Sequence, residues 1–302
     1  MIFTFNRSVQ QGDISLLAKC VLLIAEKHHH LLLDNGMSDW LSSTIIESTE
    51  YLGRVDREAL KNNREVWRVT GVQQKYQTKL TVGVEENTIT IEQLYKIVNE
   101  PSYVVLENSM YDWSAICRWV DIYRNERDFK SLNESVFRAI KEMNLRGDHS
   151  GGGNGTIVNK IKSFDGIFQE CSKLKVTTIY DSDKKSLTDS KDHNNALRDF
   201  LESFGFIGHE LHKREIENYF SIDTLRMAGM IKEEEDIPEY TPEEYDFLDI
   251  EKAPFVKYKK RLMPALSQHL HKTALKERVA HHKVSDSVDE IQLIIITLAR
   301  FI

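Results

Sequence analysis

Apolar residues recur at two different spacings along the chain, and these spacings predict where helices and strands form. Between Ile14 and Leu60 they follow helical spacing, with Asn35-Gly36 as a turn between two helices. From Lys79 to Ile91, β-branched and polar residues alternate, as in a short hairpin. A helix is expected from Ile91 to Asn99. Residues 1–100 are therefore predicted to be a mainly helical N-terminal region with one hairpin.

Two short β-rich segments in the central part of the chain each end in carboxylates. Ser102 to Glu107 (SYVVLE) precedes a helical pattern from Tyr111 to Tyr123. Lys175 to Tyr180 (KVTTIY) leads directly into Asp181-Ser182-Asp183, and a second helical pattern follows from Asn195 to Phe204. Ligands of open α/β sheets bind at the carboxyl ends of the strands. We therefore expect these acids to meet in one crevice.

Composition narrows the class of protein. The chain has 302 residues, of which 41% are hydrophobic and 29% charged, enough for a normal core in one or two domains. Its three cysteines are widely scattered, which argues against a disulfide framework and favours a reducing cytoplasm. Neither a signal peptide nor a membrane span is evident. We expect a cytoplasmic protein that does not enter a membrane.

Charge is unevenly distributed, although the net value is only -7. Residues 231–251 are strongly acidic and contain two prolines, which predicts a solvated loop. Residues 252–302 are predicted to be a helical C-terminal region, and its beginning is basic. This basic segment is the candidate phosphate-contacting surface, with an ordinary exposed helix face as the alternative. Its candidate nucleic-acid contacts are Lys257, Lys259, Lys260 and Arg261.

The pair Asp181 and Asp183 suggests a metal site. Mg²⁺ prefers carboxylate oxygens and is usually held by one or two of them, together with water and phosphate. If the strand continued through Ser182, both aspartates would point to the same side, because side chains alternate along a strand. Their mutual repulsion would then favour a cation. The alternative is a loop that carries two solvated aspartates.

The order of these motifs resembles a known family. Glu107 and Asp112 come first, followed by GGGNG at Gly151 to Gly155, the DSD motif, and HELHKREIENYF at His209 to Phe220. This succession, from Ser102 to Phe220, resembles the Toprim domain of nucleases of the overcoming-lysogenisation-defect (OLD) type. The resemblance implies an α/β fold with a mainly parallel sheet flanked by helices. The Toprim-like catalytic domain would occupy residues 101–230.

The resemblance also implies roles for individual residues. Glu107 is similar to the Toprim glutamate, a metal ligand or general acid or base, although Asn108 stands where the family commonly has glycine. Asp112 matches the early aspartate of the metal site or is only the N-cap of the next helix. The remaining acidic ligands would be Asp181, Asp183 and Glu217, with Glu215 as the alternative to Glu217.

Two lysines close to these acids in sequence are candidates for contact with phosphate. Lys184 and the catalytic candidate Lys213 would contact the scissile phosphate or stabilise the leaving oxygen, with a surface lysine as the alternative for Lys184. The glycine-rich segment would offer backbone amides to phosphate, or it is a plain turn. The HELH sequence is one residue short of the HExxH spacing, so a zinc protease is not expected.

Taken together, these features predict an endonuclease that depends on Mg²⁺ or Mn²⁺ and cuts DNA or RNA, with transfer RNA among the possible substrates. The chain lacks the GxxxxGK[ST] motif. By resemblance to phage-defence effectors, we expect a separate ATPase partner and a homo-oligomer when active. The apolar Ile291 to Ile302 would dock a partner or form a core helix. The alternative function is a non-catalytic module that binds nucleic acid or a partner.

Overall fold

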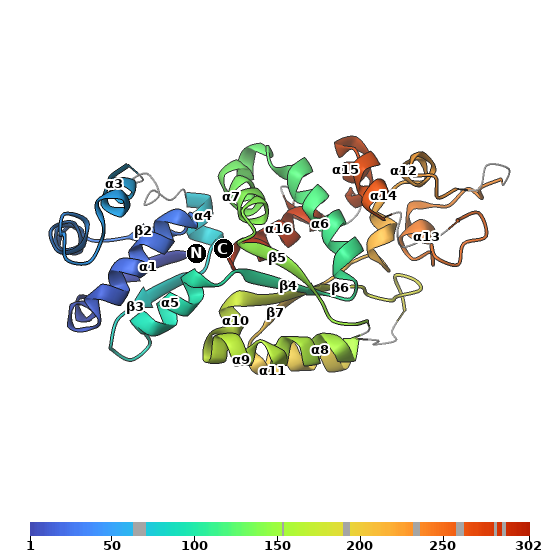
Figure 1. Cartoon of the computed structure of the whole chain (residues 1–302). Coiled ribbons are helices and arrows are strands. Elements are labelled where there is room, and N and C mark those ends of the chain that lie inside the picture. Colours follow the sequence, from blue (N-terminus) through green and yellow to red (C-terminus); the bar gives the residue numbers. More distant parts are fainter. Residues whose placement is uncertain are drawn as a thin grey trace.

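Two parallel β-sheets flanked by helices organise the protein (Figure 1). The computed structural model describes residues 1–62, 71–152, 154–189, 194–231, 236–257, 263–280, 283–285 and 288–302. The α/β class expected from the sequence is confirmed. In Figure 1 the N-terminal sheet lies to the left of the larger sheet. The helices between residues 222 and 279 lie toward the right of the larger sheet.

The first sheet has three strands in the order β2-β1-β3, formed by Ile2–Phe5 (β1), His30–Leu32 (β2) and Lys79–Val82 (β3). Both pairings are parallel. Its helices are α1 (Ile14–Glu26), α2 (Asn35–Leu41), α3 (Arg54–Asn62), α4 (Gly71–Tyr76) and α5 (Ile91–Asn99).

The second sheet has four parallel strands in the order β5-β4-β6-β7. These strands are Ser102–Leu106 (β4), Leu145–His149 (β5), Val176–Tyr180 (β6) and Ile207–Glu210 (β7). Its helices are α6 (Ser109–Tyr123), α7 (Lys130–Lys141), α8 (Asn154–Ser163), α9 (Asp165–Phe168), α10 (Ser172–Lys175) and α11 (Asn195–Phe204). After β7 come α12 (Ile222–Met227), α13 (Pro242–Asp246), α14 (Met263–His269), α15 (Lys272–Val279), the ribbon β8 (Lys283–Ser285) and β9 (Val288–Asp289), and α16 (Glu290–Ala299).

Both faces of the second sheet are buried. Val104 and Leu106 on β4 belong to the core that includes α6, α7 and α16, whereas Val105 belongs to the core that includes α8. Figure 1 shows α6, α7 and α16 on one side of this sheet and α8 with α11 on the other. A parallel strand covered on both faces is expected to be a continuous apolar run. This explains the sequence SYVVL of β4.

The expected helices and strands around the acidic motifs are confirmed. β4 and β6 form where the β-rich segments were recognised, and α5 and α11 have the predicted bounds. Thr90 begins α5 through a capping box with Gln93, which fixes that boundary locally. These elements are set by local patterns, so the sequence was sufficient to find them.

Helices make up most of the described residues of the N-terminal region, but β1, β2 and β3 also form a sheet there that was not predicted. β3 pairs in parallel with β1, so Lys79 to Ile91 is not a hairpin, and Val82 and Ile89 form only a single parallel bridge. These strands have three or four residues each, too few to show a period. Asn35-Gly36 is not a turn between helices either, because Asp34 caps α2 at this point.

Two predictions about the C-terminal third also need correction. Within the predicted acidic loop, α13 begins at a capping box formed by Thr241 and Glu244, and it buries Tyr245 and Asp246. The final apolar segment is not a docking surface in this structure, because most of α16 lies in the protein core. Its alternative reading as a core helix is confirmed. In the described part of the chain, no helix is both long and apolar enough to cross a membrane.

Candidate functional site

The carboxyl ends of all four strands of the second sheet lie along one edge. Leu106 on β4 pairs with His149 on β5, and Tyr180 on β6 pairs with Glu210 on β7. The next residue after β4 is Glu107, and the next after β6 is Asp181. Parallel pairing therefore brings these two acids, separated by more than seventy positions in the sequence, to the same edge.

A cavity of about 380 Å³ opens at this edge, and we call it the acidic cavity. Most of its lining residues are carboxylates. They are Glu107, Asp112, Asp181, Asp183, Glu215, Glu217 and Glu251, together with Asn108, Tyr111, His149, Gly151 and Gly152. All six acids proposed from the sequence as metal ligands are thus brought together. The sequence reasoning did not identify Glu251, Tyr111 or His149; Glu251 ends the acidic run that was interpreted as a solvated loop.

Asp181 lies at the centre of the electrostatics of the acidic cavity. Burial raises the pKa of its carboxyl group well above the usual value, and repulsion from Glu217, Asp112, Glu107 and Glu215 acts in the same direction. A single hydrogen bond to Oδ1 is recorded among the described residues, from the backbone N–H of Ile216 at 3.2 Å. Acidic groups are therefore concentrated around Asp181.

The Asp181-Ser182-Asp183 motif reaches the cavity by a different geometry from the one expected. β6 ends at Tyr180, and Asp183 has a left-handed backbone with φ 56°. The N–H groups of Ser182 and Asp183 both donate to the carbonyl oxygen of Arg214, at 3.0 and 3.1 Å. The predicted strand alternation through Ser182 was wrong. Both aspartates still line the cavity, because this hydrogen-bonded turn replaces the strand.

Asp112 is not the N-cap of α6. Asn108 is in that position, and the carboxylate of Asp112, in the first turn, accepts a hydrogen bond from the Asn108 N–H at 3.0 Å. This leaves Asp112 near the helix N-terminus and in the cavity wall. The φ of Asn108 is -134°, which any residue can adopt, so this position does not need glycine.

Glu215 and Glu217 both come from the HELHKREIENYF segment. The guanidinium of Arg214 donates to Glu215 at 3.0 Å and to Asp249 at 3.2 Å. Burial and repulsion from Glu217 raise the pKa of Glu215 from 4.5 to about 7, although Arg214 opposes this shift. Glu217 lies in a 3-10 helix and is only 8% exposed. Both candidate ligands are therefore present in the cavity, and no geometric feature eliminates either.

Lys213 does not reach the acidic cavity. It is completely buried and forms an ion pair with Asp246, which also pairs with Arg278. Burial lowers the pKa of Lys213 to about 8, and Arg278 adds to this effect while Asp246 opposes it. Its ammonium group also lies over the ring of Tyr219. The structure therefore places this lysine in the protein interior, where a phosphate in the cavity would not contact it.

A second buried carboxylate, Glu290, lies beside this lysine in the fold. Its two oxygens accept hydrogen bonds from the N–H of His212 at 2.7 Å and from the hydroxyl of Tyr219 at 2.6 Å, and the ring nitrogen Nε2 of His209 lies 3.1 Å away. We call Lys213, Asp246, Arg278, Glu290 and their partners the buried ionic network. It fixes the segment that carries Glu215 and Glu217.

His209, His212 and Glu290 also form the compact group of possible metal ligands found in the described residues, with ligand atoms within 4.8 Å of one another. The hydrogen bonds to Glu290 already provide a structural reason for this grouping. As expected from the HELH spacing, the two histidines are not one helical turn apart: His209 lies on β7 and His212 follows it.

The basic candidates are only partly described. The ammonium group of Lys184 lies 3.5 Å from Glu210, and Lys184 is not among the residues that line the acidic cavity. Lys257 is exposed, a few positions after the cavity residue Glu251. Lys259, Lys260 and Arg261 lie outside the described residues. After β5, Gly151 and Gly152 have φ values of 98° and 97°, which other residues rarely adopt.

Comparisons with family models, with curated proteins and with solved structures returned no match to this chain. The resemblance to Toprim nucleases therefore depends on the sequence motifs alone.

The acidic cavity has a donor set suited to a hard divalent cation. Its potential ligands are carboxylate oxygens from the ends of β4 and β6 and from the segment after β7. Mg²⁺ and Mn²⁺ favour oxygen ligands of this kind, whereas zinc sites usually include nitrogen or sulfur. A cation beside Asp181 would relieve the repulsion from its four acidic neighbours. The type of donor therefore fits Mg²⁺, although in the described residues the ligand atoms already within 4.8 Å of one another are those of His209, His212 and Glu290.

Proposed function

We propose that this protein is a metal-dependent nuclease of the Toprim type that hydrolyses phosphodiester bonds in DNA or RNA. One observation supports this proposal most strongly. Asp181 lies at the end of β6, and four further carboxylates, from the end of β4, from α6 and from the segment after β7, repel it across one cavity. These are the acids that the resemblance assigns to the Toprim metal site.

Different residues of the cavity have different proposed roles in binding the cation and the phosphate. Glu107, Asp181, Asp183 and Glu217 would hold the cation, with Glu215 as the alternative to Glu217 and Asp112 as a supporting acid. When bound, Mg²⁺ supplies Lewis acidity toward the phosphodiester and neutralises charge that develops on it. The turn at Gly151 and Gly152 lies in the cavity wall, where its backbone can approach a phosphate closely.

The net charge of the cavity makes the cation a requirement. A phosphodiester is anionic, and the cavity wall carries seven carboxylates, so substrate binding without a cation would be opposed by strong repulsion. The exposed Lys257, and the basic residues that follow it in sequence, are the proposed contacts for the more distant phosphates of the strand. Cleavage is therefore expected to stop completely when the cation is chelated.

The test is cleavage of plasmid DNA, single-stranded DNA and total transfer RNA with Mg²⁺ or Mn²⁺. The wild type is compared with the double variant Asp181→Asn, Asp183→Asn. Asp223→Asn is the matched control, because Asp223 is an exposed acid that pairs with Arg226 outside the cavity. Metal-dependent cutting by the wild type and the control, but not by the double variant, would support the proposal and identify the substrate class.

A different result would support the alternative class. If neither the wild type nor the control cuts any substrate, with or without proteins encoded beside it, the nuclease proposal fails. Retention of nucleic-acid or partner binding in the same samples would then identify a non-catalytic module.

We further propose that an ATPase encoded separately controls this nuclease as part of an antiviral defence system, and that the active form is a homo-oligomer. This part of the proposal is based on the resemblance to phage-defence effectors that work with a separate ATPase, and the 302 residues contain no P-loop motif. Purification of an active, unregulated monomer without any ATPase would contradict this part of the proposal.

A further inference from the structure

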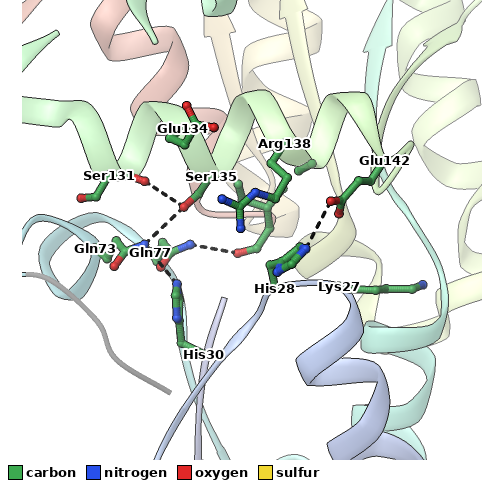
Figure 2. Close-up of a pocket in the computed structure, with 12 residues that line it drawn as sticks. Lys27, His28, His30, Gln73, Gln77, Ser131, Glu134, Ser135, Arg138 and Glu142 are labelled. Atoms are coloured by element: carbon green, nitrogen blue, oxygen red, sulfur yellow. Dashed lines mark hydrogen bonds and ion pairs between the residues drawn. The ribbon is translucent and has the colours of Figure 1, made fainter. Parts of the chain in front are cut away.

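A second cavity, of about 430 Å³, lies between the N-terminal sheet unit and helix α7 (Figure 2). We call it the polar pocket. Its lining residues are Lys27, His28, His30, Gln73, Gln77, Ser131, Glu134, Ser135, Arg138, Ala139, Glu142 and Ile302. None of them lines the acidic cavity. The polar pocket is therefore a separate feature, which the nuclease proposal does not explain.

One wall of the polar pocket is a fixed hydrogen-bonded chain. The Nε2 atom of Gln73 lies 3.1 Å from Nε2 of His30 and donates to the hydroxyl of Ser135 at 3.2 Å. That hydroxyl in turn donates to the carbonyl oxygen of Ser131 at 2.8 Å. Figure 2 shows this chain crossing from β2 and α4 to α7. The wall is thus held in place before any ligand arrives, which lowers the entropic cost of binding.

The side-chain oxygen of Gln77 is a hydrogen-bond acceptor to which no donor is directed in the described residues. The residue is only 5% exposed, and its Nε2 donates to the carbonyl oxygen of Ile302 at 3.4 Å. Its Oε1 is buried and has no hydrogen-bond partner among the described residues. Buried polar atoms are almost always hydrogen-bonded, so an exception calls for an explanation. A ligand that donates an O–H or N–H to Oε1 supplies one.

Arg138 is the group in the pocket wall that can pair with an anion. Both acidic side chains of the wall already have partners, because Glu134 forms an ion pair with Arg124 at 2.9 Å and a carboxylate oxygen of Glu142 lies 3.2 Å from the imidazole of His28. For the guanidinium of Arg138, no hydrogen bond or ion pair is recorded within the described part of the chain. Figure 2 shows Arg138 extending from α7 toward the space between Gln77 and His28.

We propose that the polar pocket binds a small organic anion that carries both an oxyanion group and a hydrogen-bond donor. Its phosphate or carboxylate pairs with Arg138, whose planar guanidinium suits two-point recognition of either group. A hydroxyl or amino group of the same molecule donates to Oε1 of Gln77. The volume of about 430 Å³ is in the range typical of small-molecule sites.

The test is isothermal titration calorimetry of the whole chain in EDTA, so that no divalent cation occupies the acidic cavity. The probes are the four common nucleoside monophosphates, ribose 5-phosphate, malate and inorganic phosphate. Binding of at least one organic probe is expected, with a stoichiometry of one per chain. The phosphate and carboxylate probes distinguish the two possible sources of the oxyanion.

Three variants locate the binding. Arg138→Gln changes an exposed side chain, so folding is retained, and it should weaken binding about tenfold or more, because a charge-assisted hydrogen bond is lost. Gln77→Leu, checked for folding by its melting temperature, should weaken the organic probes but not inorganic phosphate. Lys141→Gln, on the same helix outside the pocket, is the control and should bind like the wild type.

The proposal is overturned if no organic probe binds at millimolar concentration, or if Arg138→Gln binds as well as the wild type. The Asp181→Asn, Asp183→Asn variant must retain binding, because it leaves the polar pocket intact. Failure of the nuclease proposal would therefore not affect this result.

Discussion

The acidic cavity and the buried ionic network lie next to each other and use the same residue types in opposite ways. In the network, Asp246 pairs with Lys213 and Arg278, and Glu290 accepts from several donors. In the acidic cavity, Asp181 has four acidic neighbours. One segment of the chain, His209 to Phe220, contributes to both.

These two arrangements shift the pKa values of their carboxyl groups in opposite directions. Burial alone would raise the pKa of Glu290, yet hydrogen bonds and charge from His209 and His212 hold it below its usual value. Burial raises the pKa of Asp181, and its acidic neighbours raise it further. Hydrogen-bond and charge partners therefore favour the ionised form of a buried carboxyl group, whereas repulsion within a group of acids favours binding of a cation.

The largest expected effect is on catalysis in the acidic cavity. Glu107→Gln should lower the cleavage rate by about a hundredfold or more, because it removes a ligand charge at the end of β4. Thermal stability should stay the same or increase, since repulsion around Asp181 is reduced. The exposed Glu251→Gln is the matched variant in the same cavity and should have a much smaller effect. Equal losses for the two variants would contradict the assignment of Glu107.

The next largest effect is on stability in the buried ionic network. Asp246→Asn leaves Lys213 buried without its counter-charge, and it should lower the free energy of unfolding by about 3–5 kcal/mol. Urea denaturation measures this change. The double variant Lys213→Met, Asp246→Leu should recover much of the loss. If that stable double variant cleaves normally, Lys213 has no catalytic role. If the double variant is folded but inactive, the result supports the prediction from the sequence that Lys213 takes part in catalysis.

A smaller effect concerns the pH dependence of metal binding. In the metal-free folded protein, Glu215 keeps its proton up to about pH 7, whereas in the unfolded chain it loses it near pH 4.5. Between these values the folded state binds more protons, so the Glu215 contribution to the free energy of unfolding falls as the pH rises. Mg²⁺ at about a hundred times its Kd should add about 2.7 kcal/mol.

This stabilisation by Mg²⁺ should be greater at pH 8 than at pH 5.5, because protons compete with the cation at the lower pH. Melting temperatures at both pH values, with and without Mg²⁺, measure the difference. The Asp181→Asn, Asp183→Asn variant should show little stabilisation at either pH. A Mg²⁺ effect that is independent of pH, or that persists in this variant, would place the cation elsewhere.

The smallest expected effect is at Lys184. Its ammonium group pairs with Glu210 at 3.5 Å outside the acidic cavity, and its side chain is 37% exposed. Lys184→Gln should therefore change the free energy of unfolding by less than about 1 kcal/mol and leave the cleavage rate nearly unchanged. A large loss of cleavage with normal stability would show instead that Lys184 contacts the substrate, as the sequence suggested.

Local pattern determined much of the larger sheet. The apolar runs of β4 and β6, the helices that follow them and the acids at their ends were all found from residue type and spacing, because a buried strand and an amphipathic helix leave distinct periods in the sequence. The convergence of Glu107 and Asp181 on one edge could be predicted as well, since it depends only on parallel pairing.

Long-range contacts determined the features that the sequence did not predict. Lys213 and Glu217 belong to the same short segment, and only the positions of Asp246 and Glu290, distant in the sequence, determine that the lysine is buried while the glutamate lines the cavity. The N-terminal sheet was missed because its strands are too short to show a period and are stabilised by pairing with one another. The spacing of apolar residues shows which face of a helix or strand is buried. Tertiary packing determines which residue pairs with a buried charge.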